Sequence, residues 1–243
     1  MKKASFYWIF ILIIISFLIS LNTIKIFSIN QVGLFITVIG LIYGLIAAFT
    51  INAVWNRFDN IRNEISEEVS SLEQIWVYTR SFSNKVFSKK VSSLILRYCQ
   101  EVPNIEWKDY WLSEKTHAKF RNLVSLIATF KPKNEGESVL FDQITDEVSA
   151  ASKARDKQIL LSKLRLTKSQ WFLNIFLSFV LVFLLAFVTI PRYSVSVIIV
   201  TVMISATLII LFIMYQFDSM KILEDEVSVE PYTRLENLIK KEK

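Results

Sequence analysis

Four long runs without a charged residue alternate with strongly charged segments along this chain. The runs cover residues 6–21, 32–54, 171–190 and 193–215. Each is near the roughly 20 residues that a helix needs to cross about 30 Å of hydrocarbon. None contains a proline, and Pro191 falls between the last two runs, where the chain must reverse. The pattern therefore predicts four transmembrane helices.

The first run has a second interpretation as a cleaved signal peptide. Lys2 and Lys3 precede it, and a short basic segment before an apolar stretch is typical of such a peptide. The residues that follow, 21–25 (LNTIK), offer bulky side chains where a signal peptidase prefers alanine. We therefore expect an uncleaved span, with the removed leader as the alternative.

A helical stripe continues from the second run into the charged segment that follows it. Apolar side chains recur there at spacings of three and four, at Phe58, Ile61, Ile65, Val69, Leu72, Ile75 and Trp76. Such spacing places them on one face of an α-helix. No glycine or proline separates this stripe from the second run. The sequence thus predicts one continuous helix from about residue 32 to residue 80, which at 1.5 Å per residue is about 70 Å long.

The rest of the long charged segment also shows helical spacing. Apolar stripes cover residues 86–98, 113–130 and 139–160, and the last of them leads without a break into the third run. The period-two alternation of strands is absent. We therefore predict an all-α membrane protein with four transmembrane helices and a helical bundle between the second and third. The predicted parts are a first transmembrane pair (1–54), a helical domain continuous with the flanking spans (55–170), a second pair (171–215) and a tail (216–243).

Basic residues are distributed unevenly around the four runs. With four spans, 26 of the 28 lysines and arginines fall on the side that holds both termini and the segment 55–170, and only Lys25 and Arg192 fall on the other. Because basic flanks stay on the inner side of a membrane, both termini and the helical domain are predicted to be cytoplasmic. The net charge of +6 includes many acids interleaved with bases. This favours a surface beside anionic lipid, and no nucleic-acid partner is expected.

Composition excludes several classes of protein. Of the 243 residues, 53% are hydrophobic, and the mean hydropathy is +0.41, which is too apolar for an ordinary soluble enzyme. No Asp, Glu, Lys or Arg lies inside the four runs, which argues against a proton-coupled carrier or a voltage sensor. One cysteine, Cys99, and one histidine, His117, cannot form a disulfide or a metal site alone. We expect neither an enzyme nor a cofactor or metal.

One face of the second run carries small residues. Gly40, Gly44 and Ala48 follow one another at intervals of four. Small residues at this interval let another helix approach closely. The approaching helix belongs either to the same subunit or to a neighbouring one.

A different face of the second run carries a row of large residues, Phe35, Ile39 and Tyr43. Such a row usually faces lipid or the protein core. If the helix lines a pore, the row is a candidate hydrophobic constriction that gates by dewetting.

The segment after the second run carries a longer motif. The string NRFDNIRNEISEEVSSLEQIW occupies residues 56–76. It resembles the bestrophin-like domain family of prokaryotic membrane proteins, which shows there an Asn-Arg-aromatic-acid run, a further arginine and an acid pair. The matching positions are Asn56, Arg57, Phe58, Asp59, Arg62, Glu67 and Glu68.

The end of the chain adds to the resemblance. Phe217-Asp218 and residues 227–231 (VSVEP) are similar to the ending of that family after its last span. Together with the order of two spans, a helical insert and two spans, the resemblance covers nearly the whole chain. Glu73-Gln74 departs from the pattern, because the family usually has the small pair Gly-Thr there.

The resemblance implies a fold akin to bestrophins, which are pentameric ion channels whose second span lines the pore. It implies a homo-oligomer, a pentamer, that lies in the lipid bilayer of the bacterial inner membrane and conducts small inorganic ions passively. The neck candidates are then Phe35, Ile39 and Tyr43, and the candidates for the cytoplasmic vestibule are Glu64, Glu67 and Glu68. The alternative hypothesis is a non-conducting scaffold that binds a cytoplasmic partner through its helical domain.

Overall fold

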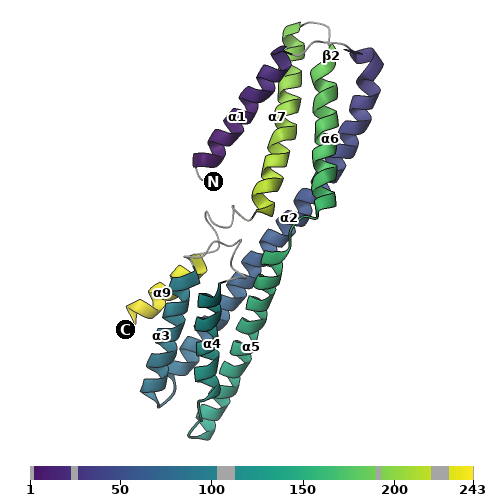
Figure 1. The fold of residues 1–243 in the computed structure, drawn as a ribbon. Coiled ribbons are helices and arrows are strands. Elements are labelled where there is room, and N and C mark those ends of the chain that lie inside the picture. The colour runs from purple at the N-terminus through teal and green to yellow at the C-terminus, as the bar shows by residue number, and fades with distance from the viewer. Residues whose placement is uncertain (1–2, 23–26, 103–112, 190–192, 220–229, 243) are drawn as a thin grey trace. The chain divides into compact units, whose positions relative to one another are not determined.

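The computed structural model describes residues 3–22, 27–102, 113–189, 193–219 and 230–242 (Figure 1). Contacts within the chain divide it into two units. Met1–Asn56 and Arg165–Asp225 form the first, which we name the apolar unit. Arg57–Leu164 and Glu226–Lys243 form the second, which we name the charged unit.

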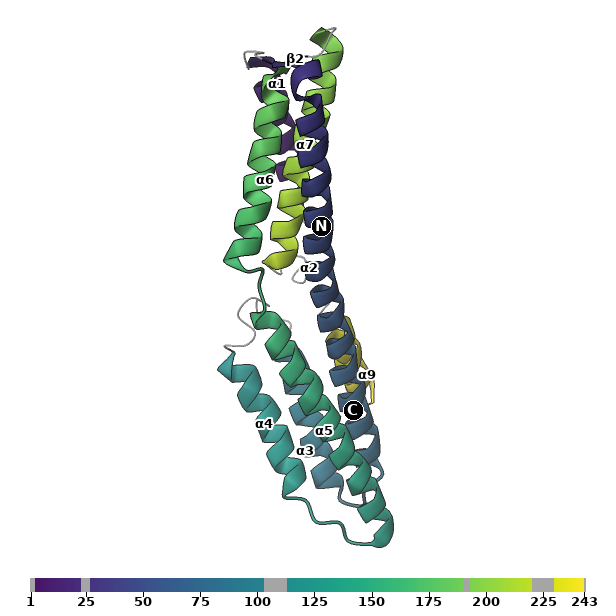
Figure 2. The same ribbon diagram turned by 90° about the vertical axis from the view of Figure 1, so that its right-hand side faces the viewer.

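The apolar unit contains α1 (Lys3–Asn22), the first part of α2 (Ile29–Arg80), α6 (Lys168–Phe187) and α7 (Tyr193–Asp218). Helix α7 packs against both α1 and α6 (Figure 2). Among the described residues, three helices, α2, α6 and α7, are long and apolar enough to cross a membrane. Helix α1 covers the first predicted span. The crossing of the membrane by α1, and hence the four-span arrangement, stays a prediction.

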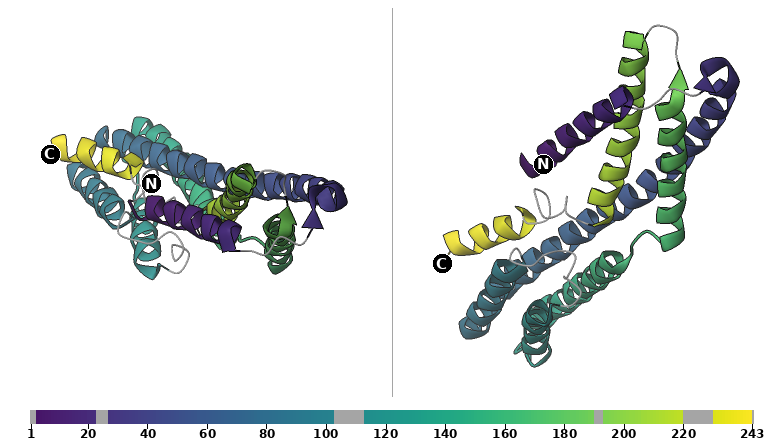
Figure 3. Two further views of the ribbon diagram at one scale, coloured as in Figure 1. Left: turned by 90° about the horizontal axis from the view of Figure 1, so that it is seen from above. Right: turned by 45° about the horizontal axis from the view of Figure 1, so that its top comes forward.

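Two short strands join the apolar unit at one end, where only helices were expected. Strand β1 (Phe27–Ser28) pairs in parallel with β2 (Val188–Thr189), with Phe27 opposite Val188 (Figure 3). The backbone of Val188 is extended, with φ −78° and ψ 136°. Because Val188 and Thr189 are β-branched, they favour this conformation. Helix α6 therefore ends at Phe187, three residues before the predicted end of the span.

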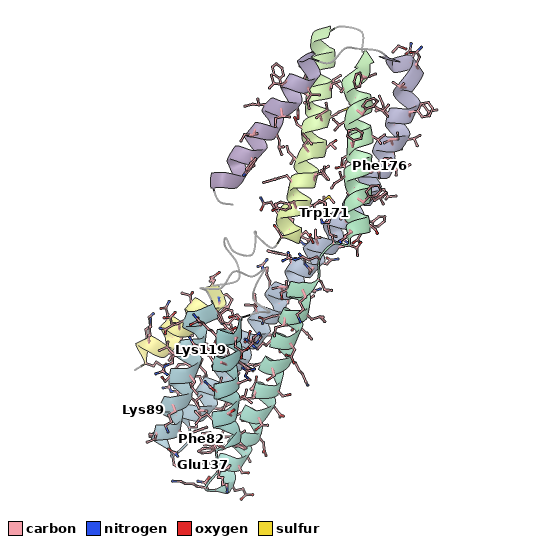
Figure 4. The ribbon with its side chains drawn as sticks, in the orientation of Figure 1. Phe82, Lys89, Lys119, Glu137, Trp171 and Phe176 are labelled. Carbon is pink, nitrogen blue, oxygen red and sulfur yellow. The ribbon has the colours of Figure 1, made fainter. Side chains whose placement is uncertain are left out.

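The charged unit contains the second part of α2 together with α3 (Lys85–Glu101), α4 (Glu114–Ala128), α5 (Glu135–Lys163) and α9 (Glu230–Lys241). Helix α3 packs against both α4 and α9. The stacked rings of Phe87 and Phe130 lie 4.0 Å apart and Phe82 packs beside them, at the same end of the unit as Glu137 (Figure 4). This unit has an all-helical core among the described residues.

The predicted long helix is confirmed. Helix α2 runs for 52 residues from Ile29 to Arg80 without interruption. The apolar stripe predicted for its second part is buried in the charged unit at every position, which are Phe58, Ile61, Ile65, Val69, Leu72, Ile75 and Trp76. The burial of one stripe explains why the 3.6-residue period is so clear in the sequence.

The predicted continuity of α5 with α6 is wrong. Helix α5 ends at Lys163, and Leu164 is extended, with φ −64° and ψ 129°. Helix α6 then starts at a capping box, in which Thr167 and Gln170 each bond to the backbone of the other. A capping box satisfies the free N–H groups of a new helix. The two helices are therefore separate.

Candidate functional site

Helix α2 exposes a line of apolar side chains in the apolar unit. The line runs at spacings of four and three through Phe35, Ile39, Ile42, Ile46 and Phe49. Phe35 and Phe49 are 62% and 67% exposed, Ile42 is also exposed, and the other two are half-buried. We name these five residues the apolar line.

The same helix exposes polar side chains in the charged unit. Asn60, Asn63, Glu67 and Ser70 are exposed, and Gln74 is half-buried. Their spacing of three and four repeats every seven residues, as that of the apolar line does. We name Asn60, Asn63, Glu67, Ser70 and Gln74 the polar line.

Tyr43 does not share the exposed face of Phe35, although both belong to the predicted row. Tyr43 is only 3% exposed, and its hydroxyl donates to the carbonyl of Thr207 in α7 at 3.3 Å. At 3.6 residues per turn, a residue eight positions along is rotated by about 80°, whereas one seven positions along is rotated by about 20°. The structure therefore places Ile42, and not Tyr43, on the line with Phe35 and Ile39.

The predicted row of small residues divides between two environments. A Cβ added to Gly40 would lie 4.0 Å from Cδ1 of Leu181, so Gly40 faces α6 within the chain. A Cβ added to Gly44 would meet nothing within 4 Å, and Ala48 is exposed. Packing within the subunit thus accounts for Gly40 alone.

Polar side chains inside the apolar unit join its helices. The amide of Asn174 in α6 donates to Oγ1 of Thr50 in α2 at 3.1 Å, and both side chains are buried. The hydroxyl of Ser178 donates to the carbonyl of Asn174 at 2.7 Å. Because the alternative for the Asn174 amide is an unsatisfied polar atom in an apolar environment, its bond to Thr50 stabilises the packing of α2 against α6, whereas the bond of Ser178 lies within α6.

Asp218, the last residue of α7, connects that helix to the start of α6. Its carboxylate accepts from the backbone N–H of Leu166 at 2.8 Å and from the indole N–H of Trp171 at 3.1 Å. The ring of Phe217 packs edge-on against Trp55 at 5.2 Å. The Phe217-Asp218 pair of the predicted family ending therefore holds the helices of the apolar unit together.

The three glutamates predicted for a vestibule occupy different environments. Glu67 is exposed, and Glu64 forms an ion pair with Lys157 at 2.9 Å. Glu68 is fully buried, at 0% exposure. Neighbouring residues on a helix point about 100° apart. Glu68 therefore faces the core of the charged unit and does not share a surface with Glu67.

Four polar side chains surround Glu68. The hydroxyl of Tyr232 and the amide of Gln158 each donate to its Oε2 at 2.7 Å. The hydroxyl of Tyr98 donates to Oε1, and Arg155 lies 3.7 Å from the same oxygen. We name these five residues the buried carboxylate cluster. It joins α2 to α3, α5 and α9.

Arg155 is the cation of the buried carboxylate cluster. It is 3% exposed, donates to the hydroxyl of Tyr98 and lies 3.0 Å from Nδ1 of His117. Its guanidinium also lies 5.2 Å from the rings of Tyr98 and Phe120. No motif in the sequence points to this residue, although a charge on the buried face of α5, between Ala151 and Gln158, is a signal of it.

The remaining residues of the predicted motif are either buried around α2 or exposed on it. Arg57 is nearly buried and donates to the carbonyl of Leu164, and Phe58 is buried. Arg62 is exposed and lies 6.0 Å from the ring of Phe58. Asn56 and Asp59 are exposed. The motif therefore combines residues that hold α2 in place with residues that α2 presents outward.

The single cysteine is chemically protected. Cys99 is fully buried, and burial, together with the negative charge of Glu68, raises the pKa of its thiol far above the usual range. A protonated, inaccessible thiol is a poor nucleophile. In the part of the chain that the structure describes, no group of three His, Cys, Asp or Glu side chains is arranged to hold a metal.

Comparison with known proteins supports the resemblance drawn from the motif. The family described as Bestrophin-like domain matches residues 10–221. No curated protein and no solved structure matches the chain. The match includes the long α2, the motif that follows its apolar part, and the Phe217-Asp218 ending. The chain therefore belongs to the bestrophin-like domain family.

Proposed function

We propose that this protein is an oligomeric membrane channel that conducts small ions passively through a pore lined by α2. The observation that carries the proposal is the outward face of this 52-residue helix. On this face the apolar line is hydrophobic throughout, and four of the five residues of the polar line are polar and uncharged. Membership of the bestrophin-like domain family supports the same function.

The spacing of the outward face favours packing between copies of the helix. Residues at alternating intervals of three and four form the seam along which helices supercoil around one another. The apolar and polar lines keep this spacing from Phe35 to Gln74. A central axis surrounded by several copies of α2 would bring all copies of this seam together.

The composition of the polar line differs from that of other exposed faces in the charged unit. Helix α3 exposes Lys85, Lys89, Lys90 and Arg97. The polar line consists of three amides, one hydroxyl and one carboxylate. A surface in contact with water alone gains nothing from excluding long charged side chains. Short uncharged polar groups, in contrast, suit the wall of an aqueous passage for ions.

The apolar line supplies the constriction in this proposal. Phe35, Ile39 and Ile42 from each copy would form rings of large side chains that restrict water and ions. Gly44 and Ala48, which are open in the single chain, would let neighbouring subunits approach closely. The predicted orientation, with both termini in the cytoplasm, would put the polar line on the cytoplasmic side.

Reconstitution into liposomes tests the proposal. Light scattering in detergent should first give a mass of several subunits. We then expect ion flux from the wild type and greater flux from Phe35→Ala and Ile42→Ala, because smaller rings hold water more readily. Leu41→Ala is the control, since Leu41 is 69% exposed on α2, against 45% for Ile42, but lies about 100° from Ile42, and its flux should equal that of the wild type.

Two results contradict a channel. One is a monomer in detergent. The other is an intact oligomer in which the wild type and both line variants leave liposomes as impermeable as protein-free ones. Stoichiometric co-purification of a cytoplasmic protein with a non-conducting oligomer would instead favour the scaffold hypothesis.

A further inference from the structure

The polar line contains a single charged residue, and its charge is negative. Glu67 is exposed between Asn63 and Ser70 on the outward face of α2. We infer that the permeant ions are cations and that Glu67 determines this preference. The inference rests on the proposed function and adds to it the charge class of the ion.

The basic residues of α2 are directed away from the polar line. Arg57 is nearly buried and bonded to the carbonyl of Leu164. Arg80 pairs with Glu242 and lies 5.1 Å from the ring of Trp76. Arg62, with Arg234, lines a groove between α2 and α9, and the helix rotates it by about 140° from Glu67. None of these cations shares the face of Glu67.

Helix α5 contributes both signs of charge next to Glu67. A groove between α2 and α5 is lined by Glu64, Glu67, Asp146, Lys153 and Lys157. Lys157 is paired with Glu64 at 2.9 Å, so the two charges offset one another. Two carboxylates, those of Glu67 and Asp146, then face the one remaining ammonium, that of Lys153. The groove keeps a net negative charge.

Symmetry would multiply this charge. Copies of Glu67 around one axis would form a ring of negative charge, as the acidic rings of cation channels do. The amides of Asn60 and Asn63 beside it add dipoles without a compensating positive charge. Such a ring raises the local concentration of cations and lowers that of anions within about a Debye length.

Reversal potentials measured across a planar bilayer with a salt gradient test the inference. The wild type should give a potassium-to-chloride permeability ratio above one. Glu67→Gln should lower the ratio by about two- to fivefold, as expected for an exposed and partly screened charge. Glu67→Lys should lower it further and bring it below one.

A control on the same helix distinguishes the loss of a Glu67 ring from the loss of any one acidic side chain. Glu73 is half-buried and pairs with Arg234 at 3.3 Å, away from the polar line. Glu73→Gln removes the same charge from the protein and should leave the permeability ratio at the wild-type value. Equal elution volumes of the variants in detergent would show that the oligomer is intact.

The outcomes separate this inference from the proposed function. Conductance that prefers chloride in the wild type, or that keeps its permeability ratio in Glu67→Gln, overturns the role of Glu67 and leaves the channel in place. Absence of conductance in every variant overturns the channel, and this inference with it. A ratio that changes equally in Glu67→Gln and Glu73→Gln overturns the assignment to Glu67.

Discussion

Glu67 and Glu68 are neighbours in the sequence, yet they belong to two regions of the charged unit with opposite properties. Glu67 lies on the exposed polar line, whereas Glu68 lies in the buried carboxylate cluster with donors from three other helices. A rotation of about 100° along one helix separates them. The acid pair of the family motif is therefore not one site. Its first member is exposed, and its second bonds to the other helices of the bundle.

The largest difference between the two glutamates should appear in stability. Glu68→Ala leaves the buried Arg155 without its carboxylate, and breaking a buried ion pair costs about 3 to 5 kcal/mol. We expect the midpoint of denaturant unfolding to fall strongly and the rate at which a thiol reagent labels Cys99 to rise.

Glu67→Ala is the matched control for that experiment. A change at an exposed site usually alters the free energy of unfolding by less than about 0.5 kcal/mol. Equal losses of stability in the two variants would contradict the division of the acid pair.

The sequence predicted the helices and their buried faces, but it did not predict the contacts between distant segments. The uncharged runs and the stripe from Phe58 to Trp76 are periodic, and period alone defines a helix and its buried face. The partners of Glu68 come from positions 98, 155, 158 and 232, and no local pattern links positions so far apart. Side chains four residues apart are nearly aligned over one turn of a helix, so the sequence pattern groups Tyr43 with Phe35. Over two turns the rotation reaches about 80°, and Tyr43 lies off the line of Phe35.

The hydrogen bond from Tyr232 should have the next largest effect. Tyr232→Phe removes one donor from the buried Glu68, and a bond to a charged group contributes about 1.5 to 3 kcal/mol. Because Tyr232 belongs to α9, we expect faster proteolysis within that helix in addition to lower stability. Asn237→Ala is the control, since Asn237 is exposed on α9, and wild-type cleavage is expected. Faster cleavage of both variants would contradict a specific role for Tyr232.

Two positions one turn apart on α2, Gly40 and Gly44, also differ in what surrounds them in the apolar unit. Gly40→Leu forces a large side chain against Leu181 and should cost about 1 to 3 kcal/mol, seen as a lower thermal midpoint in detergent. Gly44→Leu meets open space in the single chain, so we expect it to reduce the mass of the oligomer by light scattering. A Gly44→Leu protein that keeps its full mass would contradict the placement of Gly44 at a contact between subunits.

The smallest effect should come from a third glutamate, Glu137, whose carboxylate bonds to the backbone instead of to a cation. The hydroxyl of Ser83 donates to it, as do the N–H groups of Lys133 and Ser83, and these bonds lower the pKa of Glu137. A lowered pKa stabilises the folded state above the usual titration range of glutamate, and this contribution is lost as the pH falls through the lowered pKa. The denaturant midpoint of Glu137→Gln should therefore fall less between pH 7 and about pH 3 than that of the wild type. Glu135→Gln, two residues earlier in the same helix, should follow the wild-type curve. A Glu137→Gln curve parallel to the wild type would show that these bonds do not favour the ionised carboxylate.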